Sequence, residues 1–512
     1  MKLSQTSLVA IIIAFIAYLL FMIVIGAICM KRTKNTEDYF LGGRGLGSWV
    51  AALSAQASDM SGWLLMGLPG SIYALGTGQS WIAVGLFLGT VANWLLISKR
   101  LRRYTIIAGN AMTLPEFFEH RYHDKKKILL TISSVVIVIF FLVYTASALA
   151  SGGKLFNTVF GIDYHVALAI GALVILVYTF MGGFLAVCTT DFVQGSLMLI
   201  GLLSVPILAF SFVGGDFAEK IASTNVAGGY HNYLSLVMNG DRPYTFVEIL
   251  SQLAWGLGYC GMPHILVRFM AIKSEKEVTK SSAIAIVWCF LSLVAACFIG
   301  IIGRAYLAPE VLTDTEGVFI QLIERVFTKN IAAPFIGGIF LCGILAAIMS
   351  TADSQLLVCA SSVSKDIFKN LIKRDADDKT VLNTSRITVL VVAVLAFLIA
   401  WNPNSSIMGL VSDAWAGLGA AFGPAVVCAL FWKRTNLPGT VAGIVSGGLT
   451  VIIWDYLPII GGQTIGAATG IYSLLVGFFI SLLMIVVVSL CTQKPDAIIV
   501  EEFEKVKNYT EG

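Results

Sequence analysis

The stretch that decides the fold is Gln56-Ala57-Ser58-Asp59-Met60-Ser61-Gly62-Trp63, followed by Gly67-Leu68-Pro69-Gly70. It puts an acid, hydroxyls, glycines and a proline inside an apolar segment, 48–72, that is long enough to cross a bilayer. A second such segment, 244–268, contains Trp255-Gly256-Leu257-Gly258-Tyr259-Cys260-Gly261-Met262-Pro263. Glycine and proline interrupt membrane helices, and the freed carbonyls are tolerated only against protein or water. Two interrupted segments, five spans apart, predict an inverted-repeat transporter with its site near the bilayer midplane. The alternative is that the glycines only let helices pack closely.

The composition excludes a soluble enzyme. Of 512 residues, 57% are hydrophobic and only 12% are charged, whereas soluble proteins carry about 25% charged residues. The mean hydropathy is +0.85. The nine cysteines form no CxxC pair, so neither a disulfide framework nor a zinc site is indicated. No combination of nucleophile, base and metal supports an enzyme, and no cofactor other than a transported ion is expected.

Apolar runs predict about thirteen membrane-spanning helices. The first is too long for a signal-peptide core and is expected to be retained. The expected spans lie near 6–30, 48–72, 79–98, 128–156, 164–182, 185–213, 244–268, 281–304, 331–358, 386–402, 405–432, 437–456 and 468–491. Between the spans, 316–327 reads as an amphipathic surface helix. The inner loop 361–385 and the tail after Cys491 read as solvated.

Basic residues predict the orientation in the cell membrane. When the connections between spans are assigned alternately to the two sides of the membrane, one side has dense clusters of Lys and Arg. The other side has only scattered basic residues, which include Lys2, Lys220, Arg242 and Arg304. The dense side contains Lys31, Arg32, Lys34, Arg44, Lys99 to Arg103, Arg121 to Lys127, Arg268 to Lys280, Lys365 to Arg386, Lys433, Arg434 and the tail lysines. The positive-inside rule then places the N-terminus outside and the C-terminus in the cytoplasm.

Asp59 is the most informative residue of the first interrupted segment. An acid at a helix centre costs about 2.5–3.5 kcal/mol on insertion scales, and no basic residue lies nearby in the span. A bound cation or a set of hydrogen-bond donors would offset that cost. The alternative is that Asp59 caps a half-helix. Asp191, at the start of a later span, either lines an ion path or caps its helix.

The ninth span supplies oxygen ligands on one helix face. Ala347, Ser350, Thr351 and Ser354 follow the spacing i, i+3, i+4, i+7. Sodium, as a small hard cation, prefers oxygen ligands, by the same logic as other hard ions. The alternative is that these hydroxyls bond back to their own helix.

Other residues of the seventh span have simpler interpretations. Trp255 and Tyr259, at i and i+4, are expected on one face, where they would select the solute, with glycines leaving room beside them. His264 and Arg268 end the span and are expected to anchor it at the interface. Elsewhere, the repeat of Gly439, Gly443 and Gly447 is typical of a helix-packing face.

These segments resemble the bacterial sodium/proline branch of the sodium/solute symporter family, over nearly the whole chain. The similarity is carried by Ala55 to Gly70, Thr113-Leu114-Pro115-Glu116-Phe117, Gly182 to Val187, Trp255 to Tyr259, Pro263-His264-Ile265, Ile344 to Thr351 and Ala414-Trp415-Ala416-Gly417. The resemblance implies an all-α, five-plus-five inverted-repeat (LeuT-like) core with one helix before it and two after it. It implies sodium-coupled import of L-proline by alternating access.

The resemblance also implies domain boundaries and site residues. The extra N-terminal helix would occupy 1–35, the repeats 36–243 and 244–432, two further helices 433–491 and a cytoplasmic tail 492–512. The sodium ligands would be the carbonyls of Ala57, Met60 and Ala347 with the hydroxyls of Ser350 and Thr351. Asp59 and Asp191 would serve ion binding or the ion path. The solute would contact Ser61, Gly62, Tyr144, Trp255, Tyr259 and Pro263.

Three positions depart from the proline branch: Gln56, Cys260 and Met262. They keep open a symporter for another small amino acid or a carboxylate. A transporter-like sensor or a channel is the alternative from another class. Sensors append a soluble signalling domain, and the tail 492–512 is too short for one.

Overall fold

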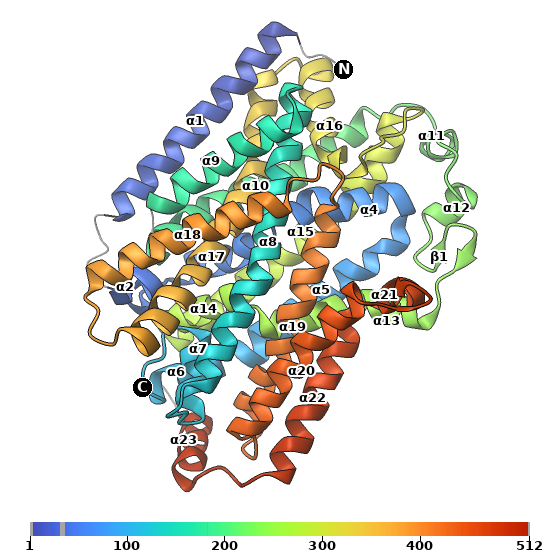
Figure 1. Cartoon of the computed structure of the whole chain (residues 1–512). Coiled ribbons are helices and arrows are strands. Elements are labelled where there is room, and N and C mark those ends of the chain that lie inside the picture. The colour runs from blue at the N-terminus through green and yellow to red at the C-terminus, as the bar shows by residue number, and fades with distance from the viewer. Residues whose placement is uncertain (1–3, 31–35, 182, 510–512) are drawn as a thin grey trace.

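The computed structural model describes residues 4–30, 36–181 and 183–509, and these are almost entirely helical (Figure 1). Lys2, Lys31, Arg32 and Lys34, on which part of the predicted orientation rests, lie outside the described residues. The first half of the chain contains α1 (Gln5–Met30), α2 (Thr36–Leu41), η1 (Gly42–Arg44), α3 (Ser48–Asp59), η2 (Trp63–Gly67), α4 (Leu68–Leu75), η3 (Thr77–Gln79), α5 (Ser80–Ala92), η4 (Asn93–Ile97), α6 (Ser98–Ile107), α7 (Leu114–Arg121), α8 (Ile128–Phe160), α9 (Tyr164–Met181), α10 (Phe184–Ser211), α11 (Phe217–Ala222), α12 (Gly229–Tyr233), β1 (Met238–Asn239) and β2 (Arg242–Pro243).

The second half is built in the same way. It contains α13 (Phe246–Leu253), η5 (Ala254–Gly261), α14 (Pro263–Ala271), α15 (Glu275–Leu307), η6 (Thr315–Gly317), α16 (Val318–Arg325), η7 (Val326–Asn330), α17 (Pro334–Ser361), η8 (Ser362–Ile372), α18 (Asp378–Ile399), α19 (Ile407–Phe431), α20 (Leu437–Tyr456), β3 (Pro458–Ile460), β4 (Gln463–Thr464), α21 (Ile465–Thr469), α22 (Ser473–Cys491) and α23 (Ala497–Asn508). The only strands in the described ranges form two short antiparallel pairs, β1 with β2 and β3 with β4.

Within the described residues, ten helices are long and apolar enough to cross a bilayer. Each corresponds to one expected span. The other three expected spans are α9, which is a shorter apolar helix, and the two interrupted segments α3–η2–α4 and α13–η5–α14. The architecture is the expected all-α membrane fold, and the count of thirteen spans stays a prediction.

Both interruptions occur where the sequence places them. The backbone leaves helical geometry at Met60 (φ −83°, ψ 79°) and at Met262 (φ −88°, ψ 104°). Around these breaks, α3 packs against α10, α14 and α15, while α8 packs against α17 and α19. In Figure 1, α20 and α22 run along one flank, and α1 lies on the opposite side of the molecule against α17. The two breaks are therefore enclosed, since Met60 and Met262 are both fully buried.

Glycines allow the closest backbone approach, between α5 and η5. A Cβ on Gly256 would lie 2.1 Å from the Gly85 carbonyl oxygen, and one on Gly89 would lie 2.2 Å from the Gly256 carbonyl oxygen. Small residues are what lets membrane helices approach this closely. The same holds for the predicted packing face on α20, where Gly439 and Gly443 contact α22 and Gly447 contacts α19, so that prediction is confirmed.

Three expectations about surface segments are wrong, at least in part. The loop 361–385 is not fully solvated, since it begins with the helix η8, in which Ser364 and Asp366 are fully buried. The segment 316–327 is helical, but Phe319, Leu322 and Ile323 are fully buried, because α16 packs against α15 and α17. Its first residue, Glu316, pairs with Lys154 at 2.7 Å and accepts from the first backbone N–H groups of α19. The tail after Cys491 is not fully solvated, since α23 packs against α6 with Phe503 only 4% exposed.

We expect Gly89→Ala to destabilise the protein by about 1–3 kcal/mol. The added methyl group would overlap backbone atoms of Gly256, which, unlike a side chain, cannot rotate out of the way. The measurement is the apparent melting temperature in detergent. Gly26→Ala in α1 is the matched control, since a Cβ there meets nothing within 4 Å. Equal melting temperatures for the two variants would show that α5 and η5 are not closely packed.

Candidate functional site

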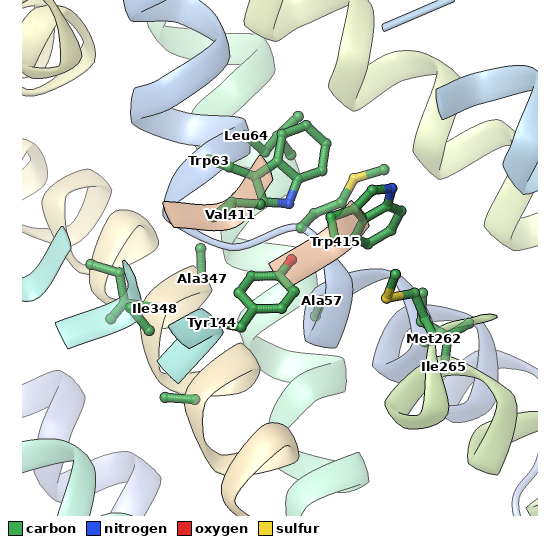
Figure 2. Close-up of a cluster of buried hydrophobic side chains, with 14 of the residues drawn as sticks. Ala57, Trp63, Leu64, Tyr144, Met262, Ile265, Ala347, Ile348, Val411 and Trp415 are labelled. Carbon is green, nitrogen blue, oxygen red and sulfur yellow. The ribbon is translucent and has the colours of Figure 1, made fainter. Parts of the chain in front are cut away.

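The two interruptions meet at Asp59. Its side chain is fully buried, and its Oδ2 accepts a 2.6 Å hydrogen bond from the hydroxyl of Tyr259 in η5. The Asp59 carbonyl, at the end of α3, accepts from Trp63 Nε1 at 2.9 Å and from the Tyr144 hydroxyl at 3.4 Å. Figure 2 shows Tyr144 beside Ala57 and Ala347, with its hydroxyl pointing toward Trp63. Both broken helices and α8 therefore converge on one acid.

The expected sodium ligands of α17 face the same end of α3. The Ser350 hydroxyl lies 2.8 Å from the Ala57 carbonyl oxygen and 3.2 Å from that of Ala347. The Thr351 hydroxyl lies 3.3 Å from the Ala57 carbonyl oxygen. Met60 ends α3 outside helical geometry, so its carbonyl is released from the helical ladder. The fold thus brings oxygen atoms of α3 and α17 together at the break.

The structure also bears on the two alternatives, that Ser350 and Thr351 only bond back to their own helix and that Asp59 caps a half-helix. Ser350 bonds both to its own helix and across to α3, whereas the bond recorded for Thr351 in the described part of the chain crosses to α3. Asp59 does not act as a cap here, because its carboxylate accepts from Tyr259 rather than from a backbone N–H. The Ser61 hydroxyl accepts instead from the Trp63 N–H, at 3.4 Å. Asp59 Oδ1 has no hydrogen-bond partner among the residues described.

The expectation that Trp255 and Tyr259 share one face is wrong. Residues 254–261 form a 3₁₀-helix, in which three residues make a turn, so i and i+4 point in different directions. Trp255 stacks on Tyr472 with ring centroids 5.1 Å apart, while Tyr259 donates to Asp59 and makes a T-shaped contact with Trp415. The glycines beside them make room for neighbouring helices, since a Cβ on Gly258 would lie 2.1 Å from the Trp415 indole nitrogen.

The other expected solute residues either line one of two cavities or are buried. A cavity of about 390 Å³, lined by Trp255, Tyr472 and Asp413, opens on the expected outer side, and we call it the outer cavity. A narrow cavity of about 20 Å³, the inner cavity, is lined by Pro263, Arg268 and Ser354. Ser61, Gly62, Tyr144 and Tyr259 are buried. Gly62 packs directly on Ser151 of α8, where a Cβ would lie 2.2 Å from the hydroxyl.

Asp191 lies in a buried ionic cluster, away from the Asp59 group. Its Oδ2 accepts from Ser54 at 2.7 Å and from Arg268 at 3.2 Å, and Arg268 also donates to Ser354 at 2.6 Å. Ser54 and Ser354 lie about one turn beyond Ala57 and Ser350 on the same two helices. His264 and Arg268 are 0% and 1% exposed, so the expectation that they anchor the span at the interface is wrong.

Sequence reasoning did not assign three residues, two at the Asp59 group and one at the buried ionic cluster. Trp63 donates to the Asp59 carbonyl, and Trp415 Nε1 donates to the Trp255 carbonyl at 2.8 Å. Both stand in motifs that carry the family resemblance, but nothing in their spacing predicts these bonds. Asp353 is fully buried in α17 beside Ser354. The rule that singled out Asp59, an acid within a span, would also have identified Asp353.

Sequence comparisons relate the chain to one transporter family. The family model described as the sodium:solute symporter family matches residues 39–447. The chain is 45% identical to the high-affinity proline transporter PutP of Bacillus subtilis, covering 94% of this chain and 98% of that protein. It is 43% identical to the osmoregulated proline transporter OpuE of the same organism, covering 95% of this chain and 96% of that protein. A sodium/proline symporter of Staphylococcus aureus is 43% identical, covering 96% and 94%.

Solved structures share the fold at lower sequence identity. A sodium-coupled sialic acid symporter in a substrate-bound, outward-open state superposes with a TM-score of 0.76 at 18% identity, covering 95% of this chain and 99% of that one. MHP1, a nucleobase-cation-symport-1 family transporter in a closed conformation, superposes with a TM-score of 0.56 at 13% identity, covering 93% and 100%. These likenesses establish the fold of the chain.

We expect Thr351→Ala to lower sodium affinity about 5- to 150-fold, because losing a buried partner of a charge costs about 1–3 kcal/mol. The measurement is binding of radioactive sodium to the purified protein. Thr388→Ala is the matched control, since that buried hydroxyl bonds to its own helix at Thr384. Sodium binding that is unchanged in Thr351→Ala would remove this hydroxyl from the site.

We expect Tyr259→Phe to weaken sodium binding in the same assay by about tenfold, because the Tyr259 hydroxyl donates to the buried Asp59 carboxylate and its loss would disturb the end of α3 that carries the Ala57 and Met60 carbonyls. Trp255→Phe should leave sodium binding nearly unchanged, since the Trp255 side chain lies beside Tyr472 and the outer cavity. Equal losses in the two variants would mean that these aromatics act only by supporting η5.

Proposed function

The chain belongs to the sodium:solute symporter family, and we propose that it imports L-proline by coupling proline entry to sodium entry. The relatives that cover nearly its whole length are named as proline transporters or sodium/proline symporters. Within the chain, the observation that carries the proposal is the meeting of the Ser350 and Thr351 hydroxyls with the freed end of α3 beside Asp59. The protein is a multi-pass membrane protein of a transporter family.

Sodium is the transported ion in this proposal, and its ligands are oxygen atoms of two helices. The carbonyls of Ala57, Met60 and Ala347 and the hydroxyls of Ser350 and Thr351 would surround the ion. A bound sodium would take over the contacts that these hydroxyls now make with the Ala57 carbonyl. Because the ligands come from α3 and α17, sodium binding would draw the interrupted helix toward α17.

Proline would bind beside the ion, where the broken helices expose their ends. The N-termini of η2 and α14, at Trp63 and Pro263, are partially positive and suit the carboxylate of an amino acid. Asp59 and the freed carbonyls of α3 suit its ammonium group. The apolar ring would pack among Tyr144, Trp255 and Tyr259, as small-molecule sites combine apolar walls with a few polar groups. Ser61 and Gly62 would complete the wall on the side of α8.

The path through the protein follows from the two cavities. Solute would enter from the outer cavity past Trp255 and leave past Pro263 into an inner cavity that is now narrow. Asp191 lies beside the inner cavity, through its ion pair with Arg268, and would serve the ion as it leaves. In our proposal 36–243 and 244–432 are the two inverted repeats, since each begins with one interrupted segment.

Sodium entry supplies enough energy for concentrative uptake. One charge moving through about 100 mV contributes roughly 2.3 kcal/mol. A tenfold sodium gradient contributes about 1.4 kcal/mol more. Together these terms support an accumulation of solute of several hundred-fold, on the order of 10² to 10³.

We expect proteoliposomes that contain the chain to accumulate labelled proline when a sodium gradient is imposed. Uptake should collapse without sodium, because the ion and the solute bind as a linked pair. Thr351→Ala should lose apparent proline affinity at low sodium and largely recover it at saturating sodium.

Two results would contradict the proposal. Equal accumulation driven by a proton gradient alone would exclude sodium coupling. Failure of excess unlabelled proline to compete with labelled proline for uptake would exclude proline as the solute. The same competition panel includes other small amino acids and carboxylates, which would then be the candidates. That second outcome bears on Cys260, which lies in η5, and on Met262, which lies at the break between η5 and α14.

A further inference from the structure

An apolar groove runs along the outside of the helices that carry the site. It has a volume of about 560 Å³ and lies between α3, α10 and α15, with Leu53, Ile200, Val287 and Leu291 among its lining residues. That volume is in the range of small-molecule sites, about 300–1,000 Å³. Val287 is 59% exposed and Ile200 is 55% exposed, so the groove opens outward. Because these helices cross the membrane, it opens into lipid.

The walls of the groove offer almost no polar group. The Ser196 hydroxyl bonds back to its own helix at the Phe192 carbonyl, 2.8 Å away. The Trp288 indole nitrogen donates to the Gly195 carbonyl at 3.2 Å. A hydrocarbon chain can therefore fill the groove without leaving a buried polar group unpaired.

One end of the groove carries a positive charge and an exposed indole. Lys280 precedes the lining residues Ala283, Ile284 and Val287 by three, four and seven positions, so it lies on the same face of α15. Its side chain is 67% exposed, and its ammonium lies 3.3 Å from Glu277 Oε1. That pair leaves capacity for another partner, since an ammonium has three donors. The other carboxylate oxygen of Glu277 accepts from the first N–H of α3, at Ser48.

Trp49 closes the same end from α3. It is 61% exposed and lines the groove within two residues of the start of α3. Tryptophan is enriched where a membrane protein meets the lipid headgroups. A lysine and a tryptophan at the mouth of an apolar groove match a lipid with a negative headgroup and an acyl chain.

We propose that this groove binds one anionic glycerophospholipid of the bilayer, with an acyl chain along α3, α10 and α15 and the phosphate at Lys280. The lipid contacts the half of the interrupted helix that ends at Ala57 and Asp59. It therefore lies against the element that sodium binding is proposed to move, and its binding depends on which position that half-helix takes. The proposal does not depend on the identity of the transported solute.

Brominated phospholipids test the proposal directly, because bromine quenches tryptophan fluorescence at short range and Trp49 lines the groove. The protein is reconstituted into vesicles in which either phosphatidylglycerol or phosphatidylcholine is brominated. The contribution of Trp49 is the difference in quenching between the unchanged chain and Trp49→Phe. We expect phosphatidylglycerol to reach half-maximal quenching of Trp49 at a concentration about fivefold lower than phosphatidylcholine does. One lysine near an anionic lipid contributes about 1 kcal/mol, which corresponds to about fivefold in affinity.

Lys280→Gln should abolish this preference while leaving quenching by both lipids in place. Lys494→Gln is the matched control, because that exposed lysine lies in the connection after α22, outside the residues that line the groove. Equal quenching of Trp49 by the two lipids in the unchanged chain would mean that only ordinary surrounding lipid fills the groove. Quenching by neither lipid would mean that a second copy of the chain covers Trp49, which would also overturn the proposal.

Should Trp49→Phe fail to fold, total quenching of the unchanged chain is compared with that of Lys280→Gln under the same two lipids. A preference for phosphatidylglycerol that survives Lys280→Gln would overturn the proposal. A preference that disappears with Lys280→Gln and persists with Lys494→Gln would support it.

Discussion

The hydrogen bond between Asp59 and Tyr259 is the contact around which this structure is organised. It joins two helices that are both interrupted inside a hydrophobic environment, where an unpaired backbone or side-chain polar group costs several kcal/mol. Each interruption alone would leave such groups exposed to lipid. Placed against each other, and covered by Tyr144 from α8 and Trp415 from α19, they pair one oxygen of the Asp59 carboxylate with the Tyr259 hydroxyl at 2.6 Å. The continuous helices must therefore close around this pair.

The same arrangement explains why we propose a cation site at this position. A helix that ends inside the protein releases carbonyl oxygens, and the end of α3 presents them to the hydroxyls of α17. The hydroxyls and carbonyls that stabilise the broken helix are the ligands that a sodium ion would use. In our proposal, structural support and ion binding therefore compete for one set of atoms. Such competition lets the ion change how tightly α3 and α17 are held.

Two features beyond the site follow from the position of α3. Toward one end it meets the buried Asp191–Arg268 pair through Ser54, so charge on the inner side is held by the same half-helix that carries Asp59. On its outer face it lines the apolar groove through Trp49 and Leu53. The proposed ion site, the inner ionic cluster and the groove thus each involve a different face of the short helix α3. A displacement of that helix would reach all three.

The sequence by itself determined the fold class and the two interruptions, and it singled out Asp59, Ser350 and Thr351 as candidate site residues. Hydropathy, mid-span glycines and a mid-span acid are local signals. They are informative because the bilayer fixes the length of a span and makes a buried acid costly. Only the tertiary structure decided which residues these groups contact and which side chains are buried. The 3₁₀ winding of η5 separates Trp255 from Tyr259, because helix type depends on the packing of Gly256 and Gly258 against α5 and α19. Likewise, His264, Arg268 and α16 are buried rather than at the surface, since burial depends on which helices pack beside them and not on position along the chain.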